Sequence, residues 1–189
     1  MKTLIFSIAL SALFFVACNN EGTKNRSAEE PSLAAESTQK TSIAPVNPAG
    51  ELVNNYLQLK NALTKDNDKD AATAGNEMVK AFTNFDKASL TPEQAKVYND
   101  VEEDAKEHAE HIGANEGNIE HQREHFDTLS EEMYELVKSV GAGQKLYYTH
   151  CPMYNDNKGA NWLSQTKEIQ NPYLGQAMST CGTVKEELD

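Results

Sequence analysis

Two sulfur-containing segments near the C-terminal end of the chain hold the residues best suited to metal chemistry. The first is His150-Cys151-Pro152-Met153, and the second is Met178-Ser179-Thr180-Cys181-Gly182. Thiolate and thioether sulfurs are the soft ligands that select Cu(I), and an imidazole can add a nitrogen. If the two segments meet, Cys151, Met153, Met178 and Cys181 would offer two to four soft ligands to Cu(I), and His150 could add a nitrogen.

The same two cysteines also suit a disulfide. Outside the cytoplasm, a pair of cysteines is first of all a disulfide candidate. A Cys151–Cys181 bond would close a loop of about thirty residues and stabilise the fold by roughly 3–4 kcal/mol. An oxidised pair has no thiolate to offer a metal, so the two interpretations compete directly. The chemistry of these residues alone slightly favours the disulfide, with the methionines as packing.

Four histidines form an alternative candidate metal site. His108 and His111 are three residues apart, and His121 and His125 are four apart, so each pair lies on one side of a predicted helix. In an antiparallel hairpin that turns near Glu116, the two pairs would lie opposite each other and could bind copper or zinc. The other interpretation is a solvated polar face. Periodicity favours that face, because it places His108 and His125 at the border of the apolar stripe and His111 and His121 further round, toward water. Convergence of the two pairs depends on the rotation of the helices, which the sequence does not determine.

The N-terminal residues predict export and lipid attachment. An apolar run from Leu4 to Ala17 follows the basic Lys2, which is typical of a signal peptide covering residues 1–17. The run ends in Phe15-Val16-Ala17-Cys18, which resembles a lipobox. We therefore expect Cys18 to be acylated and to anchor the protein in the cell envelope, at the outer membrane or the periplasmic face, without a transmembrane helix.

The remaining chain predicts a tether followed by one domain. Residues 18–48 are rich in Ser, Thr, Asn, Glu, Ala and Pro, a composition that favours a flexible tether. Residues 49–189 form the domain. Four amphipathic segments with short connections predict a mainly α fold, an up-and-down four-helix bundle over residues 51–140. The loop-rich segment 144–189 should add one or two short strands, the first at residues 145–149.

Composition and motifs exclude several classes of function. The net charge of −12 argues against nucleic-acid binding, which needs a basic face. We find no Gly-x-Ser-x-Gly, phosphate loop or Cys-x-x-Cys, and no acid–base pair, so we do not expect an enzyme. Acidic residues follow part of a calcium-loop pattern, but Ala71 occupies the position that needs glycine, so a helix start explains them better. These acids are Asp66, Asp68, Asp70 and Glu77.

Six motifs carry a resemblance to a known family: residues 56–63 (YLQLKNAL), 122–130 (QREHF with Leu129-Ser130), 148–153 (YTHCPM), 159–164 (GANWLS), 169–175 (IQNPYLG) and 178–182 (MSTCG). Through these motifs, residues 51–189 resemble the extracytoplasmic domain family DUF3347, which is common in Bacteroidetes lipoproteins. Leu174 and Gln176 depart from the usual aromatic and acidic residues of the family, and neither position carries a sulfur.

The resemblance implies a role in handling heavy metals. The family is similar to domains fused to periplasmic adaptor subunits of heavy-metal efflux systems, and the Cys-Pro-Met motif resembles the short metal-binding modules of those systems. It implies copper or silver as the ion and efflux adaptor or pump components as partners, and no catalytic residues. We therefore expect a lipid-anchored envelope protein that binds a soft metal. The alternative is a structural or interaction domain stapled by a Cys151–Cys181 disulfide.

Overall fold

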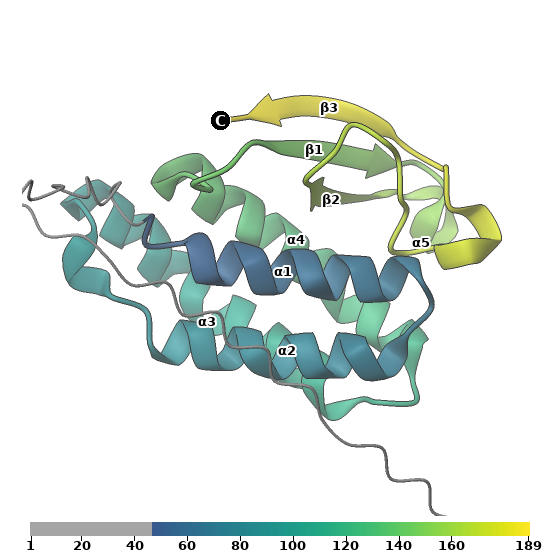
Figure 1. Ribbon diagram of the computed structural model, residues 1–189, viewed down its shortest axis with the longest axis horizontal. Helices are drawn as coiled ribbons and strands as arrows, with labels where there is room; N and C mark the ends of the chain where they lie inside the picture. The colour runs from purple at the N-terminus through teal and green to yellow at the C-terminus, as the bar shows by residue number, and fades with distance from the viewer. Residues whose placement is uncertain (1–46) are drawn as a thin grey trace, which may run out of the picture. The chain divides into compact units, whose positions relative to one another are not determined.

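The structure, a computed structural model, describes residues 47–189. The predicted signal peptide, Cys18 and nearly all of the predicted tether lie outside the described residues. Within residues 47–189, no helix is both long and apolar enough to cross a membrane. Four long helices and a small sheet make up this part of the chain (Figure 1).

Capping side chains in the local sequence explain where three of the long helices begin. The long helices are α1 (Gly50–Thr64), α2 (Asp68–Thr83), α3 (Pro92–Ala114) and α4 (Ile119–Val140). The side chain of Asn67 caps α2, and Thr91 forms a capping box with Gln94 at the start of α3, where Pro92 takes the first helical position. Asn118 accepts a hydrogen bond from the His121 backbone N–H and begins α4. Helix α2 ends at Thr83, and a short 3-10 turn, η1 (Lys87–Ser89), follows.

Apolar faces of the four helices form one continuous core. Consecutive helices pack on each other, α1 on α2, α2 on α3 and α3 on α4. The predicted helical faces supply this core, including Tyr56, Met78, Tyr98, Phe126 and Met133, each fully buried. The mainly helical class is confirmed. The up-and-down order of the helices stays a prediction.

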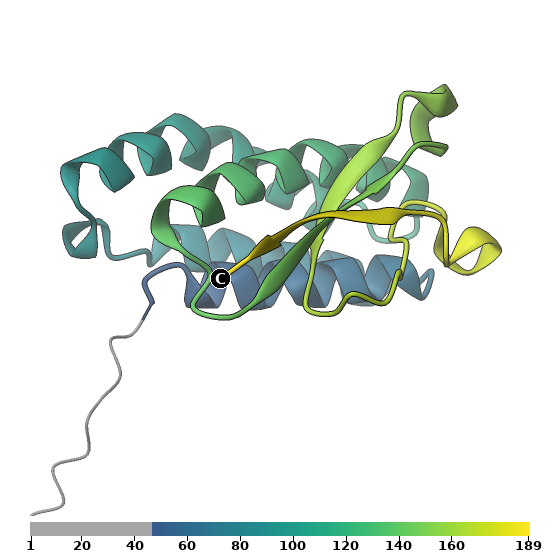
Figure 2. The same ribbon diagram turned by 90° about the horizontal axis from the view of Figure 1, so that it is seen from above.

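The C-terminal segment forms a three-stranded antiparallel sheet, not the one or two strands that we predicted. The strands β1 (Leu146–Cys151), β2 (Ala160–Ser164) and β3 (Thr183–Leu188) are arranged in the order β2-β1-β3. Strand β3 is an edge strand with the sequence Thr-Val-Lys-Glu-Glu-Leu, and alternate residues face solvent. Its apolar signal is therefore weak, which explains why sequence patterns missed it. The two views show the sheet lying across α1 and α4 (Figures 1 and 2).

The turns between the strands carry unusual backbone conformations. Between β1 and β2, the short helix α5 (Tyr154–Asn157) ends in three consecutive left-handed residues, Asn155, Asp156 and Asn157. Asn and Asp tolerate this conformation best among residues with a side chain. A second 3-10 turn, η2 (Gly175–Met178), precedes β3. Gly175 has a φ of +53°, and a Cβ there would lie 1.8 Å from Asp66 Oδ1, so only glycine fits.

A buried hydroxyl joins the sheet to the helices. Tyr56 of α1 lies 2.8 Å from Ser130 Oγ of α4, and its hydroxyl accepts a hydrogen bond of 3.0 Å from the backbone N–H of Leu163 in β2. The Tyr56 ring also stacks on Phe126 of α4. Three elements that are distant in sequence therefore meet at one side chain.

We predict that Tyr56→Phe lowers the free energy of unfolding by about 1–2 kcal/mol, because the Leu163 N–H and the Ser130 hydroxyl both lose a buried partner. Denaturant unfolding followed by circular dichroism measures the change. Tyr147→Phe is the matched control, since its side chain is only partly buried and its hydroxyl makes no hydrogen bond within the described residues. An equal effect of the two substitutions would show that the Tyr56 hydroxyl does not stabilise this junction.

Candidate metal centre

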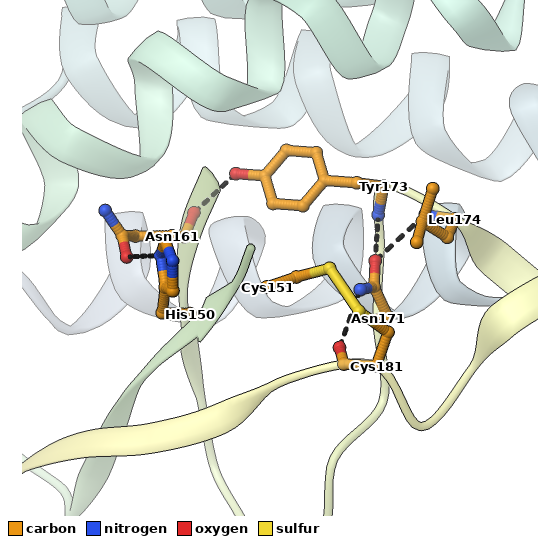
Figure 3. The surroundings of a disulfide bond; sticks show 7 residues. All are labelled: His150, Cys151, Asn161, Asn171, Tyr173, Leu174 and Cys181. Carbon is orange, nitrogen blue, oxygen red and sulfur yellow. Dashed lines mark hydrogen bonds between the residues drawn. A yellow bond between two sulfur atoms is a disulfide. The ribbon is translucent and has the colours of Figure 1, made fainter. Parts of the chain in front are cut away.

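The two sulfur-containing segments meet in a disulfide. Cys151 ends β1 and is fully buried, whereas Cys181 follows η2 and is partly exposed. Their Cα atoms are 5.7 Å apart and the two sulfurs are bonded (Figure 3). Asn171 holds the second segment in place, because its amide Nδ2 donates to the carbonyl of Cys181 at 2.7 Å and its Oδ1 accepts from the backbone N–H groups of Tyr173 and Leu174.

The other predicted soft ligands are placed differently. Met153 and Met178 are exposed to solvent, at 49% and 42%. His150 points to Asn161 on β2, with Nδ1 at 2.8 Å from Asn161 Oδ1, on the other side of β1 from the disulfide (Figure 3). Neighbouring residues of a strand face opposite sides, so His150 and Cys151 diverge. Only the two cysteines of the predicted sulfur site are joined, and as a disulfide they offer no thiolate to a metal.

The four histidines of α3 and α4 converge. His125 is at the centre, with Nδ1 at 2.8 Å from Nδ1 of His108 and Nε2 at 3.1 Å from Nε2 of His121. The His111 ring stacks on His125 with centroids 4.3 Å apart. One nitrogen from each of His111, His121 and His125 lies within 4.8 Å of the others. We call these four residues the histidine cluster.

Burial favours the neutral form of two imidazoles in the cluster, those of His125 and His108. Burial, reinforced by the neighbouring imidazoles of His111, His108 and His121, lowers the pKa of His125 to about 4. Burial also lowers the pKa of His108, although the nearby carboxylates of Glu107 and Asp104 oppose the shift. A neutral imidazole has the free lone pair that a metal ion needs, so His125 is ready to bind at pH 7.

Carboxylates stand beside the outer histidines. Glu124 Oε2 is 3.1 Å from His121 Nδ1, and Glu107 Oε1 is 3.7 Å from His111 Nε2. The His121–Glu124 hydrogen bond assigns the proton of His121 to Nδ1, which leaves Nε2 with a lone pair facing His125. The spacing of three residues between His121 and Glu124 could have indicated this pair from the sequence, but our sequence analysis did not select it.

The cluster has the dimensions of a transition-metal site. Zinc and copper bind imidazole nitrogen at about 2.0–2.1 Å, which separates two ligand nitrogens by roughly 3.3 Å in a tetrahedral site. The spacing of 3.1 Å between His121 and His125 is close to that value. His111 is largely solvent-exposed, so its ring can adjust to complete the set. The chemistry of the donors, all imidazole nitrogens, suits Cu(II) or Zn(II).

The four acidic residues that follow part of a calcium-loop pattern have structural roles. Asp66 accepts a hydrogen bond from the Arg123 guanidinium, and another of 3.1 Å from the backbone N–H of Gln176. Asp68 and Asp70 lie in the first turn of α2, where acids favour the helix start. Glu77 lies further along the same helix and forms an ion pair with Lys80. These four acids do not surround a common point. This agrees with the sequence analysis, which favoured a helix start over a calcium loop.

The fold and the cluster define a mainly helical domain with a small C-terminal sheet and a nitrogen-rich candidate metal centre. Residues 52–145 match the family model described as "Protein of unknown function (DUF3347)", so the chain contains a DUF3347 domain. The matched residues cover α1 to α4 and therefore include the histidine cluster. Comparison with curated proteins and with solved structures gave no match.

The lowered pKa of His125 predicts a loss of stability in acid. The pKa of His125 is 6.5 in the unfolded chain and about 4 in the folded chain. At a pH between these two values, His125 binds a proton in the unfolded chain but not in the folded chain. Stability should therefore fall as the pH decreases through this interval, by about 1 kcal/mol, since solvent screens the partly exposed ring. Thermal unfolding of the wild type and of His125→Gln at pH 7.5 and pH 4.5 tests this. The wild type should lose more stability than the variant, and parallel losses would contradict the prediction.

Proposed function

We propose that the protein binds a copper ion in the cell envelope and serves as an accessory to heavy-metal efflux or homeostasis. The histidine cluster is the proposed binding site. The observation that carries this proposal is the convergence of ligand nitrogens from His111, His121 and His125 within 4.8 Å. Four of the five histidines in the chain lie in this one cluster, which is not expected for a solvated polar face.

The composition of the cluster favours a divalent ion. Imidazole nitrogen is a borderline ligand that suits Cu(II) and Zn(II), whereas Cu(I) and silver prefer sulfur. The two cysteines that could supply thiolates are joined in a disulfide. An oxidising compartment favours both the disulfide and the divalent state of copper. The carboxylates of Asp104, Glu107 and Glu124 around the cluster would raise the local concentration of cations.

The proposed cellular setting is supported by features of the sequence. The signal-like residues 1–17 and the lipobox-like Cys18 support a lipid anchor in the envelope, and the motifs shared with DUF3347 support an association with efflux adaptors or pump components. The predicted tether, residues 18–48, would hold the domain above the membrane, with the four helices as an up-and-down bundle. In this setting a copper site on the α3–α4 hairpin would face the periplasm or the exterior.

A second candidate function is a structural or interaction domain without a metal. The Cys151–Cys181 disulfide favours it, because the bond connects the end of β1 to the segment that precedes β3 and so stabilises the sheet. In this case the histidine cluster would contribute only packing and hydrogen bonds.

Isothermal titration of the mature protein with Cu²⁺ tests the first function. We expect about one equivalent to bind, and we expect His121→Ala with His125→Ala to lower the affinity by at least about 100-fold, because two of the ligands are lost. His150→Ala is the control, since this histidine lies in β1 outside the cluster and should leave binding unchanged. If the double variant binds Cu²⁺ like the wild type, the histidine cluster is not the site.

The state of the two cysteines is a separate prediction. Mass spectrometry of protein isolated from the envelope without reductant should show the loss of two hydrogens and no reactive thiol at Cys151 or Cys181. Replacing both by Ser should lower the free energy of unfolding by roughly 3–4 kcal/mol. Cu²⁺ binding should survive the replacement at low temperature. Reactive thiols in the wild type, with Cu(I) binding that the double replacement abolishes, would instead locate the site at the sulfur segments.

A further inference from the structure

We infer that the histidine cluster is a three-histidine centre whose fourth coordination position is open and exchangeable. His111, His121 and His125 are the ligands in this arrangement. Two polar side chains that hydrogen-bond to these ligands, His108 and Glu124, are positioning residues that do not bind the ion. The inference rests on the proposed function, and it assigns a separate role to each member of the site.

His125 can offer only one of its nitrogens to the ion. Its Nε2 faces Nε2 of His121, and its Nδ1 faces Nδ1 of His108. A ligating histidine holds its orientation by donating the other ring N–H to an acceptor. Since Nε2 is directed at the other two ligands, Nδ1–H of His125 has His108 as its acceptor when the ion is bound. His108 therefore acts on the ion through His125, in agreement with its absence from the convergent set of three nitrogens.

For His108 to accept a hydrogen bond from His125 when the ion is bound, protons must move between these two histidines and water. The total number of protons on the pair stays the same. In the ion-free cluster, Glu124 accepts from Nδ1 of His121, so Nε2 of His121 accepts from Nε2–H of His125, and Nδ1 of His125 accepts from Nδ1–H of His108. When the ion binds, the proton on Nε2 of His125 goes to water. The proton on Nδ1 of His108 passes to Nδ1 of His125, and water protonates Nε2 of His108. No net proton is gained or lost by the pair.

Glu124 has the corresponding role at His121. Its carboxylate accepts the Nδ1–H of His121 at 3.1 Å, and this contact directs Nε2 toward His125. The carboxylate–histidine–metal arrangement is a common way to fix the tautomer of a ligand and to raise its basicity. His111 lacks such a contact, because Glu107 lies 3.7 Å from its Nε2, beyond hydrogen-bonding distance.

Three ligands leave a coordination position for water or for an exchanging ligand. Metal sites with four protein ligands are closed and structural, whereas those with three keep an open position. Here the third ligand, His111, is 46% exposed and lies at the solvent side of the cluster. An ion held in this way can be taken up and released at the surface, as an accessory of metal transport requires.

Five variants of the mature protein test the positioning roles, with Cu²⁺ alone as the probe. Glu124→Ala should weaken Cu²⁺ binding about 10-fold by removing the acceptor of His121, and Glu124→Gln should recover most of it because an amide oxygen still accepts. Glu120→Ala is the matched control, since it removes the same charge one residue before His121 and should change the affinity much less. His108→Ala should weaken binding about 10-fold, while His121→Ala should weaken it far more.

Electron paramagnetic resonance of the Cu²⁺-loaded proteins separates ligands from positioning residues. The nitrogen coupling pattern should be the same in the wild type, Glu124→Ala and His108→Ala, and it should change in His121→Ala. Azide added to the loaded wild type should alter the spectrum by occupying the open position.

The outcomes distinguish this inference from the proposed function. A wild type that binds no Cu²⁺ overturns both. A wild type that binds Cu²⁺ through the cluster, but loses a nitrogen coupling in His108→Ala and does not respond to azide, keeps the function and overturns the three-histidine centre. Equal weakening by Glu124→Ala and Glu120→Ala would show that Glu124 acts only through its charge and does not position His121.

Discussion

The packing of α4 on two sides is the constraint on which the rest of this structure depends. One side of the helix packs on α3 and another packs on β2 of the C-terminal sheet. Phe126, Leu129, Ser130 and Met133 are fully buried between these partners, and the Tyr56 hydroxyl ties Ser130 to both α1 and β2. A helix held on two sides cannot rotate about its axis without breaking one set of contacts.

The rotation of α4 decides the chemistry of the domain. With Phe126 and Leu129 directed into the core, the adjacent residue His125 lies at the border between α3 and α4, where it meets both histidines of α3. Arg123 lies on the opposite border, where its guanidinium donates to the carbonyl of Pro172 in the C-terminal segment and to the carbonyl of Leu63 in α1. The same helix therefore directs imidazole nitrogens to one side and anchors the sheet region on the other.

The sulfur atoms and the clustered imidazole nitrogens lie in two different parts of the domain. Sulfur ligands suit monovalent ions, and imidazoles suit divalent ions. Because the sulfurs are joined to each other, the nitrogen cluster is the part of the described structure with free donor atoms in a convergent arrangement. The sulfur segments strengthen the fold in this state, and Asn171 and Tyr173 pack around them and connect them to β2 through the Asn161 carbonyl (Figure 3).

The sequence by itself determined the helices, their caps and the residues available for chemistry, because these depend on local periodicity and on side chains within four residues of each other. One example of a cap is Thr91 followed by Pro92. Examples of residues available for chemistry are the pairs His108/His111 and His121/His125. The edge strand β3 escaped detection because half of its side chains face water. Only the tertiary structure decided that the two histidine pairs converge and that Met153 and Met178 remain exposed. Convergence depends on the rotation of one helix against another, and that rotation is set by core contacts between residues that are far apart in the chain.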